Sequence, residues 1–164
     1  MTSVARSAPG RHGRPRRLDA FAVASEPGNE RLVIARVAES VASAELPAAR
    51  RERLKTAVAE AVMNAIEHGN GNRKEFPVDI EVTQDGDEIT VSISDQGGSP
   101  SMAAAEEPDL AMKLDGAQSP RGWGLFLIRK MVDVMDVTTD GERHTVLLTM
   151  RTGAPGGADH DEQV

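Results

Sequence analysis

The sequence contains no cysteine, which excludes disulfide bonds, thiolate zinc sites and thiol nucleophiles together. It also lacks long apolar runs. The strongly apolar run LFLI, at 125–128, is far shorter than the roughly 20 residues that a helix needs to span a bilayer. A secretory signal has an apolar segment after its basic N-terminus, and this chain has no such segment there. These absences predict a soluble, cytoplasmic protein that does not enter a membrane.

Positive charge is scarce outside the N-terminus. The first 17 residues, MTSVARSAPGRHGRPRR, hold five arginines and no acidic residue, and their apolar content is too low for folding. The whole chain carries a formal charge of −7, so residues 18–164 carry −12 once these five positive charges are set aside. Nucleic-acid binding depends on a basic face that neutralises phosphates, so we expect no direct nucleic-acid ligand.

The length of 164 residues suits one domain with a tail at each end, since domains typically hold about 100 to 200 residues. We expect a disordered basic arm at 1–17, a folded domain at 18–151 and a disordered tail at 152–164. The expected elements are a strand at 18–24, two helices at 29–46 and 48–67, and a hairpin at 78–95. A long loop at 96–121, a helix at 121–135 and a pair of strands within 137–150 follow. This order predicts the α+β class, as a two-layer sandwich with helices on one face of a mostly antiparallel sheet.

Local signals set the expected boundaries. The hairpin has apolar residues at every second position in both strands, around a turn at Asp85-Gly86. Asn29 is the expected N-cap of the first helix, and Pro47 marks its end. The second helix is expected to end where Gly69 adopts the left-handed conformation.

Three polar residues lie along the second helix, each four residues after the one before: Glu60, Asn64 and His68. At about 100° per residue they form a stripe directly beside the apolar face, where side chains line a cleft more readily than bulk solvent. An amide oxygen is a hard ligand for Mg²⁺, and a nearby carboxylate can accept a proton from an attacking hydroxyl. Taken alone, the stripe also fits an ordinary solvated flank of a helix.

Two glycine motifs follow in the chain. Asp95 ends a strand and is followed by Gly97 and Gly98, so a flat ring can approach the backbone while the carboxylate accepts a bond from its exocyclic amine. Adenine offers such an amine. Further on, Gly122 and Gly124 open a helix, where free N–H groups and the helix dipole favour phosphate. Either motif alone is also compatible with a simple turn or bend.

The joint order of these motifs is more specific than any one of them. EAVMNAIEH on a helix, a hairpin ending in DQGG, a long loop and RGWGLFLI opening a helix resemble the N box and two glycine boxes of the ATP-binding module of gyrase, histidine kinases and related (GHKL) ATPases. The likeness covers about residues 18–151. Because the chain holds only this module, it looks most similar to the stand-alone anti-sigma-factor serine/threonine kinases of bacterial partner-switching systems.

The resemblance implies roles for the residues in these boxes. Asn64 would hold Mg²⁺ against the phosphates of ATP, and Glu60 would be the general base. The other residues that the resemblance places at the nucleotide are His68, Asp95, Gly97, Gly98, Arg121, Gly122, Gly124 and Thr145. Thr145, with Gly141, would match a glycine-threonine element beside the adenine pocket. Position 99 is serine where many members of the wider superfamily have a further glycine, so the loop that follows departs from the common pattern.

The resemblance also implies partners. It points to a homodimer that sequesters a sigma factor and phosphorylates an anti-anti-sigma protein of the STAS type on serine or threonine. Arg36, on the first helix, is the candidate partner-facing residue, with an ordinary surface arginine as the alternative. A nucleotide-gated module that binds its partner without phosphorylating it is a second possible function, and an interaction domain that binds no nucleotide is a third.

Overall fold

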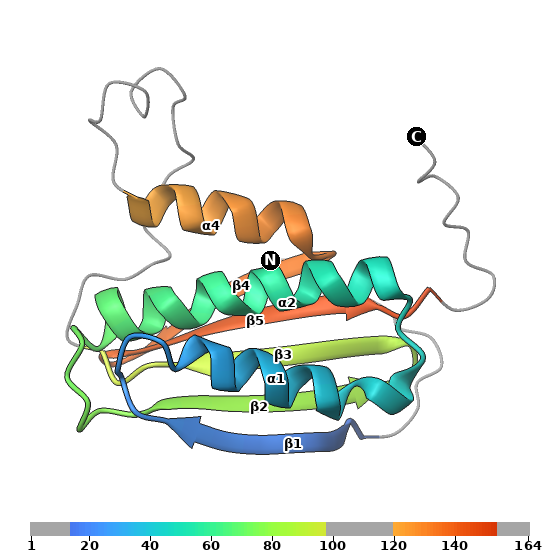
Figure 1. The fold of residues 1–164 in the computed structure, drawn as a ribbon, viewed down its shortest axis with the longest axis horizontal. Coiled ribbons are helices and arrows are strands. Elements are labelled where there is room, and N and C mark those ends of the chain that lie inside the picture. Colours follow the sequence, from blue (N-terminus) through green and yellow to red (C-terminus); the bar gives the residue numbers. More distant parts are fainter. Residues whose placement is uncertain (1–13, 98–119, 154–164) are drawn as a thin grey trace, which may run out of the picture.

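The fold has two layers, with helices covering one face of a five-stranded sheet (Figure 1). The computed structural model describes residues 14–97 and 120–153. Its strands are β1 (Arg16–Val23), β2 (Val78–Asp85), β3 (Glu88–Ser94), β4 (Val134–Asp140) and β5 (Arg143–Arg151). Its helical segments are α1 (Glu30–Ser40), the 3₁₀ turn η1 (Ala42–Ala44), α2 (Ala48–Asn64), the π-helical turn η2 (Ala65–Gly69) and α4 (Pro120–Met131). The strands are ordered β1-β2-β3-β5-β4 and every neighbouring pair is antiparallel, which confirms the predicted α+β sandwich.

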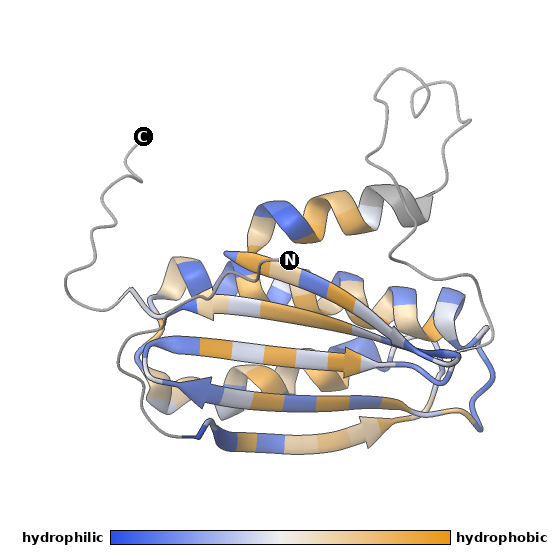
Figure 2. Cartoon of the chain, turned by 180° about the vertical axis from the view of Figure 1, so that it is seen from behind, coloured by the Kyte–Doolittle hydropathy of each residue, from blue (hydrophilic) through white to orange (hydrophobic). Residues whose placement is uncertain are grey.

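The core lies between the sheet and the helices. Apolar and polar residues alternate along β2 and β3, as the colours of Figure 2 show, and the apolar residues of β2, β3 and β5 supply the buried residues of the sheet. The buried positions of the hairpin are the predicted ones: Val78, Ile80, Val82, Ile89, Val91 and Ile93. Helix α2 packs on α1, on α4 and on strands β3 and β5, and so lies at the centre of the helical layer.

Several boundaries differ from the sequence prediction. Strand β1 begins at Arg16, two residues inside the predicted arm. Helix α1 ends at Ser40, well before Pro47, because the chain continues into η1 and then adopts a left-handed conformation at Glu45, with φ of 62°. Asn29 is the N-cap residue of α1, as predicted, but its side chain makes no capping hydrogen bond; its amide nitrogen donates instead to the carbonyl of Ala24 at 2.8 Å.

The third long helix is shorter than expected. Helix α4 ends at Met131 and β4 begins at Val134, whereas the prediction continued the helix to residue 135. Asp133 redirects the chain here: its N–H donates to the carbonyl of Thr149 at 3.0 Å, and its carboxylate accepts from the Arg151 N–H at 2.7 Å. None of the helices within 14–97 and 120–153 is both long and apolar enough to cross a bilayer.

Candidate functional site

The first two residues of the polar stripe, Glu60 and Asn64, lie on α2 as predicted. Asn64 is 6% exposed and Glu60 is half-buried, beside the buried apolar face of the same helix. His68 departs from the stripe because it lies in the π-helical turn η2, where Asn70 N–H donates to the carbonyl of Ala65, five residues back. A wider turn rotates His68 away from the line of a regular helix. Its ring is 36% exposed and lies 4.0 Å from the carboxylate of Glu67.

Helix α4 faces the stripe through a glycine. A methyl group placed on Gly124 would lie 3.1 Å from the amide nitrogen of Asn64 and 3.2 Å from a carboxylate oxygen of Glu60. The glycine therefore allows the backbone of α4 to approach both polar groups closely. Helix α4 begins at Pro120, so Gly124 lies inside the helix and not at its mouth, as the sequence had indicated.

The amide nitrogen of Asn64 is unusual because it is buried without a partner. It is the one buried side-chain polar atom in residues 14–97 and 120–153 that makes no hydrogen bond. Leaving such a group unsatisfied costs about 1–3 kcal/mol, so an unpaired buried amide calls for an explanation such as a ligand. The amide oxygen is a suitable Mg²⁺ ligand, and the Glu60 carboxylate is adjacent. This pair is the part of the chain that best fits a metal-bound phosphate.

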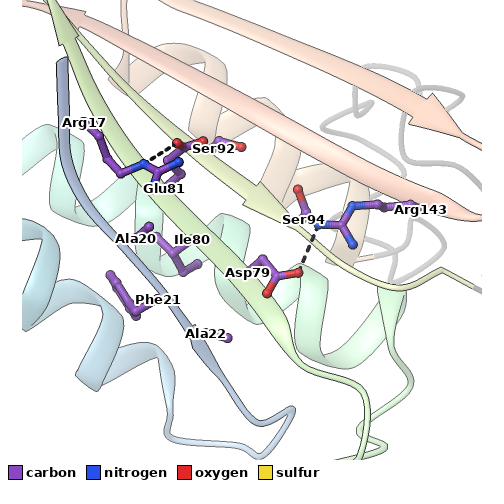
Figure 3. Close-up of a pocket in the computed structure, with 10 residues that line it drawn as sticks. All are labelled: Arg17, Ala20, Phe21, Ala22, Asp79, Ile80, Glu81, Ser92, Ser94 and Arg143. Carbon is purple, nitrogen blue, oxygen red and sulfur yellow. Dashed lines mark hydrogen bonds and ion pairs between the residues drawn. The ribbon is translucent and has the colours of Figure 1, made fainter. Parts of the chain in front are cut away.

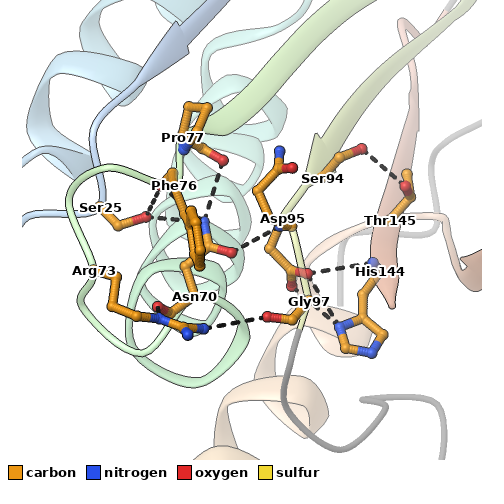
Figure 4. Close-up of polar contacts among 11 residues, drawn as sticks. Ser25, Asn70, Arg73, Phe76, Pro77, Ser94, Asp95, Gly97, His144 and Thr145 are labelled. Carbon is orange, nitrogen blue, oxygen red and sulfur yellow. Dashed lines mark hydrogen bonds and ion pairs between the residues drawn. The ribbon is translucent and has the colours of Figure 1, made fainter. Parts of the chain in front are cut away.

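Asp95 occupies a second, deeper position. It follows β3, is 1% exposed, and lies beside His144 of β5, whose ring Nδ1 is 3.1 Å from its Oδ1 (Figure 4). Burial raises the pKa of Asp95 above its usual value of 3.8, while the charge and hydrogen bonds of His144 act in the opposite direction. A buried carboxylate at the end of a strand, aimed at few partners, is suited to read one ligand donor.

Gly69 is needed because of Asp95. Its φ is not in the left-handed region, so the predicted C-cap role is wrong; a methyl group at Gly69 would instead overlap the Asp95 carboxylate. Gly97 does have a positive φ, of 95°, and a methyl group there would overlap the carbonyl oxygen of Glu142 in the β4–β5 turn. Both glycines therefore allow close contact within the protein, at the place where the adenine was predicted to bind.

Asn70 organises this end of the molecule and was missed by sequence reasoning. It is fully buried; its amide nitrogen lies 2.9 Å from Ser25 Oγ and within 3.2 Å of the carbonyl oxygens of Phe76 and Pro77, and its amide oxygen accepts from Gln96 N–H at 2.7 Å (Figure 4). The surrounding HGNGNR reads as an ordinary loop, and no periodicity singles out this asparagine.

Thr145 contacts Ser94 and not Asp95. Its hydroxyl is 2.8 Å from that of Ser94, on the opposite side of β5 from the side chain that contacts Asp95. Successive residues of a strand point to opposite faces, so His144 takes the inner position and Thr145 the outer one (Figure 4). His144 is thus the residue of this element that meets Asp95.

Arg36 is engaged within the chain. Its guanidinium pairs with the carboxylate of Asp19 at 2.7 and 3.1 Å and lies 4.0 Å from the ring centre of Phe21. About half of its side chain remains exposed. Gly98 and the side chain of Arg121 lie outside the described residues, and Gly122 is placed only as part of the first turn of α4.

A hollow of about 440 Å³ lies elsewhere, on the face of the sheet that the helices leave uncovered (Figure 3). Two ion pairs border it, Arg17 with Glu81 and Asp79 with Arg143, each at 3.0 Å. All four side chains are at least two-fifths exposed, so the pairs are solvated. The buried polar residue that lines the hollow, Ser94, is already hydrogen-bonded to Thr145, whereas the Asn64 amide nitrogen has no partner, so we place the candidate site on the helical side of the sheet.

Comparison with known proteins identifies the family of the chain. The family model of the histidine kinase-like ATPase domain matches residues 23–150. An anti-sigma F factor of Oceanobacillus iheyensis is 33% identical over 127 residues, which cover 77% of this chain and 84% of that protein. An anti-sigma F factor of Clostridium beijerinckii is 35% identical over 88 residues, covering 53% of this chain and 60% of that protein, so the chain spans less than two thirds of that relative.

Two solved structures share the fold. The RsbU and RsbW domains of Rv1364c from Mycobacterium tuberculosis superpose with a TM-score of 0.56 at 20% identity, over 84% of this chain and 33% of that one. A chain of the SiaB-SiaC complex from Pseudomonas aeruginosa gives 0.59 at 14% identity, over 82% of this chain and 90% of that one. The chain therefore belongs to the histidine kinase-like ATPase domain family and is a relative of the anti-sigma F factors.

Proposed function

We propose that this protein is an ATP-dependent serine/threonine kinase that acts as an anti-sigma factor. In this proposal it sequesters a sigma factor and phosphorylates an anti-anti-sigma protein on a serine or threonine. The names of its relatives support the regulatory role. The observation that carries the nucleotide site is the buried, unpartnered amide nitrogen of Asn64, a donor suited to a phosphate oxygen, which lies beside the carboxylate of Glu60 and faces Gly124 of α4.

The described residues fit Mg-ATP in their chemistry. Asn64 supplies an amide oxygen to the metal, which when bound offsets the negative charge of the phosphates. Asp95 accepts a hydrogen bond from the exocyclic amine of adenine. Gly122 and Gly124 bring the backbone of α4 close to the phosphates, and Arg121 is placed beside them in sequence. His68, at the end of the stripe, is 36% exposed and can reach only the rim of such a site.

Glu60 is the proposed general base. It accepts the proton of the partner's hydroxyl as that oxygen bonds to the γ-phosphorus, while the bond from the γ-phosphorus to the bridging oxygen breaks and ADP leaves. Its carboxylate makes no hydrogen bond or ion pair with another residue in 14–97 or 120–153, so it is available to a ligand. This availability distinguishes Glu60 from Asp95, which is held by His144.

A nucleotide-gated binding module without transferase activity is the second candidate. The same site would bind Mg-ATP there, and the nucleotide would only control affinity for the partner. A carboxylate at the position of Glu60 favours the kinase, because a pure binding module has no need for a proton acceptor beside the phosphates.

Glu60→Gln separates the two functions. The change keeps the size of the side chain but removes proton acceptance, so nucleotide binding should survive while phosphoryl transfer falls by about 10²- to 10⁴-fold. The assay mixes the protein with radiolabelled ATP and a candidate antagonist protein, follows label on serine, and monitors nucleotide binding through Trp123, the only tryptophan. Transfer at the wild-type rate by Glu60→Gln would remove Glu60 as the base, and no transfer by the wild type would favour the binding module.

Partner binding is tested with Arg36→Ala and a matched control, Asp19→Ala. Both changes break the ion pair between α1 and β1, but only the first removes the guanidinium that a partner would contact. If Arg36 faces the partner, Arg36→Ala weakens the complex with the sigma factor and spares ATP binding, whereas Asp19→Ala leaves the complex intact. Equal losses in both variants would show that the pair only supports the fold.

A further inference from the structure

His144 is a buried histidine to which the proposed function gives no task. It is 3% exposed and lies at the start of β5, opposite the end of β3. Its carbonyl accepts from Asp95 N–H at 3.0 Å, its own N–H donates to Asp95 Oδ1 at 3.3 Å, and its ring Nδ1 lies 3.1 Å from the same oxygen. The two residues are therefore joined through backbone, side chain and ring (Figure 4).

The contact links the tautomer of the ring to the charge of Asp95. An ionised carboxylate can only accept hydrogen bonds, so an ionised Asp95 requires the proton of the neutral ring to be on Nδ1. Burial favours the neutral, protonated form of Asp95 and raises its pKa, while His144 and a backbone hydrogen bond from Gly97 favour the ionised form. The protonation state of the Asp95 carboxylate thus depends on a donor that its neighbour provides.

The protonation state decides what the carboxylate can recognise. An ionised Asp95 accepts hydrogen bonds only, whereas a protonated one also donates. The exocyclic amine of adenine is a donor, and the oxygen at the same position of a 6-oxopurine is an acceptor. A donor supplied by His144 therefore favours adenine at this position and disfavours the 6-oxopurine.

We propose that His144 is a positioning residue that holds Asp95 as an ionised acceptor and so sets the preference of the site for adenine over 6-oxopurines. His144 contacts Oδ1 through both its backbone N–H and its ring, and the backbone of Gly97 donates a third hydrogen bond to the carboxylate. Since a carboxylate has about four acceptor positions, one remains for an incoming amine once these three are counted. This inference rests on the proposed nucleotide site.

The test compares binding of Mg-ADP and Mg-IDP by calorimetry to wild type, His144→Leu and His144→Asn. Leucine fills the space but donates nothing, so ADP affinity should fall by about tenfold or more while IDP affinity changes little. Asparagine keeps a side-chain N–H at a similar reach and should restore most of the ADP preference. Melting temperatures of the three proteins show whether each variant is folded.

The outcomes are distinct. An unchanged ratio of ADP to IDP affinity in a folded His144→Leu, or an equal loss of both, would assign His144 to packing and overturn the proposal. A second measurement needs no variant: the ¹⁵N shifts of the His144 ring in the wild-type protein should show a protonated Nδ1 at neutral pH, and an unprotonated Nδ1 would also overturn it. Wild-type protein that binds neither nucleotide would overturn the nucleotide site itself, and this assignment with it.

Discussion

Three glycines at this site allow neighbouring groups to approach the backbone closely. Gly69 leaves room for the carboxylate of Asp95, Gly97 for the carbonyl of Glu142, and Gly124 for the side chains on α2. Sequence motifs identify such glycines well, because only glycine tolerates these contacts. They do not say which group makes the approach: all three glycines face protein atoms, although Gly97 and Gly124 were predicted to contact the nucleotide and Gly69 to end a helix.

Gly124→Ala tests the contact between α4 and the stripe. Alanine favours a helix interior over glycine by about 1 kcal/mol, but the new methyl group would lie 3.1 Å from Asn64 and 3.2 Å from Glu60. These polar ends must shift by a few tenths of an ångström. We expect stability to change by less than about 1 kcal/mol and Mg-ATP affinity to fall clearly. Leu127→Ala is the control, because that side chain is 38% exposed on the same helix; a normal affinity in Gly124→Ala would contradict the assignment.

Asp95→Asn should separate stability from binding. Because burial raises the pKa of Asp95 above 3.8, the folded protein keeps this proton at pH values where the unfolded chain has lost it. The contribution of Asp95 to the free energy of unfolding therefore falls as the pH rises from 3.8 through the pKa of the folded state. At neutral pH the buried carboxylate is charged, and the protein is less stable by the extra free energy that ionising it costs in the folded state. Asparagine carries no such cost, so the variant should melt higher than wild type at pH 7 and bind ADP more weakly.

The control for this comparison is Asp79→Asn, whose carboxylate is 43% exposed and pairs with Arg143. It should show no gain in melting temperature at pH 7. Among the described residues, the titratable group that contacts Asp95 is His144 on β5. A melting curve for Asp95→Asn that follows wild type at every pH would contradict the raised pKa.

At the scale of elements, the sequence predicted the strands better than the helix ends. Alternation of apolar residues places β2 and β3 correctly because one face of each is buried. The end of α2 depends on contacts distant in sequence: η2 widens the helix, Gly69 faces Asp95, and Asn70 ties the next loop to three other segments. No local pattern encodes such contacts. For the same reason His144 was overlooked in favour of Thr145, its neighbour.

Asn70→Ala tests this junction of elements. The change removes the hydrogen bonds that join the loops around Ser25, Phe76 and Gln96, and it leaves several buried polar groups unsatisfied. We expect a loss of about 3 kcal/mol, measured by urea denaturation, together with faster amide exchange at Gln96. Asn29→Ala, which loses a single side-chain bond to the Ala24 carbonyl, should cost only about 1 kcal/mol. Similar losses of unfolding free energy in both variants would contradict the inference that Asn70 joins these loops.

For the whole molecule, the candidate site joins parts that are distant in sequence. Glu60 and Asn64 come from α2, Asp95 follows β3, His144 comes from β5, and Gly124 from α4. The family resemblance also implies a homodimer, which sedimentation of the purified protein can test. Because the parts of the site come together only in the folded chain, a ligand bound there should stabilise the fold as a whole and not one element.

Mg-ATP should therefore raise the melting temperature of the protein. A ligand at 100 times its dissociation constant stabilises the native state by about 2.7 kcal/mol, which is about 8 °C for a domain of this size. Chelation of magnesium, or Asn64→Ala, should remove most of the gain, because the Asn64 amide is the proposed protein ligand of the metal. AMP, which has adenine but not the outer phosphates, should give a smaller shift that is insensitive to magnesium and is lost in Asp95→Ala. Equal shifts by ATP with and without magnesium would contradict the metal role of Asn64, and no shift at millimolar Mg-ATP would contradict the nucleotide site.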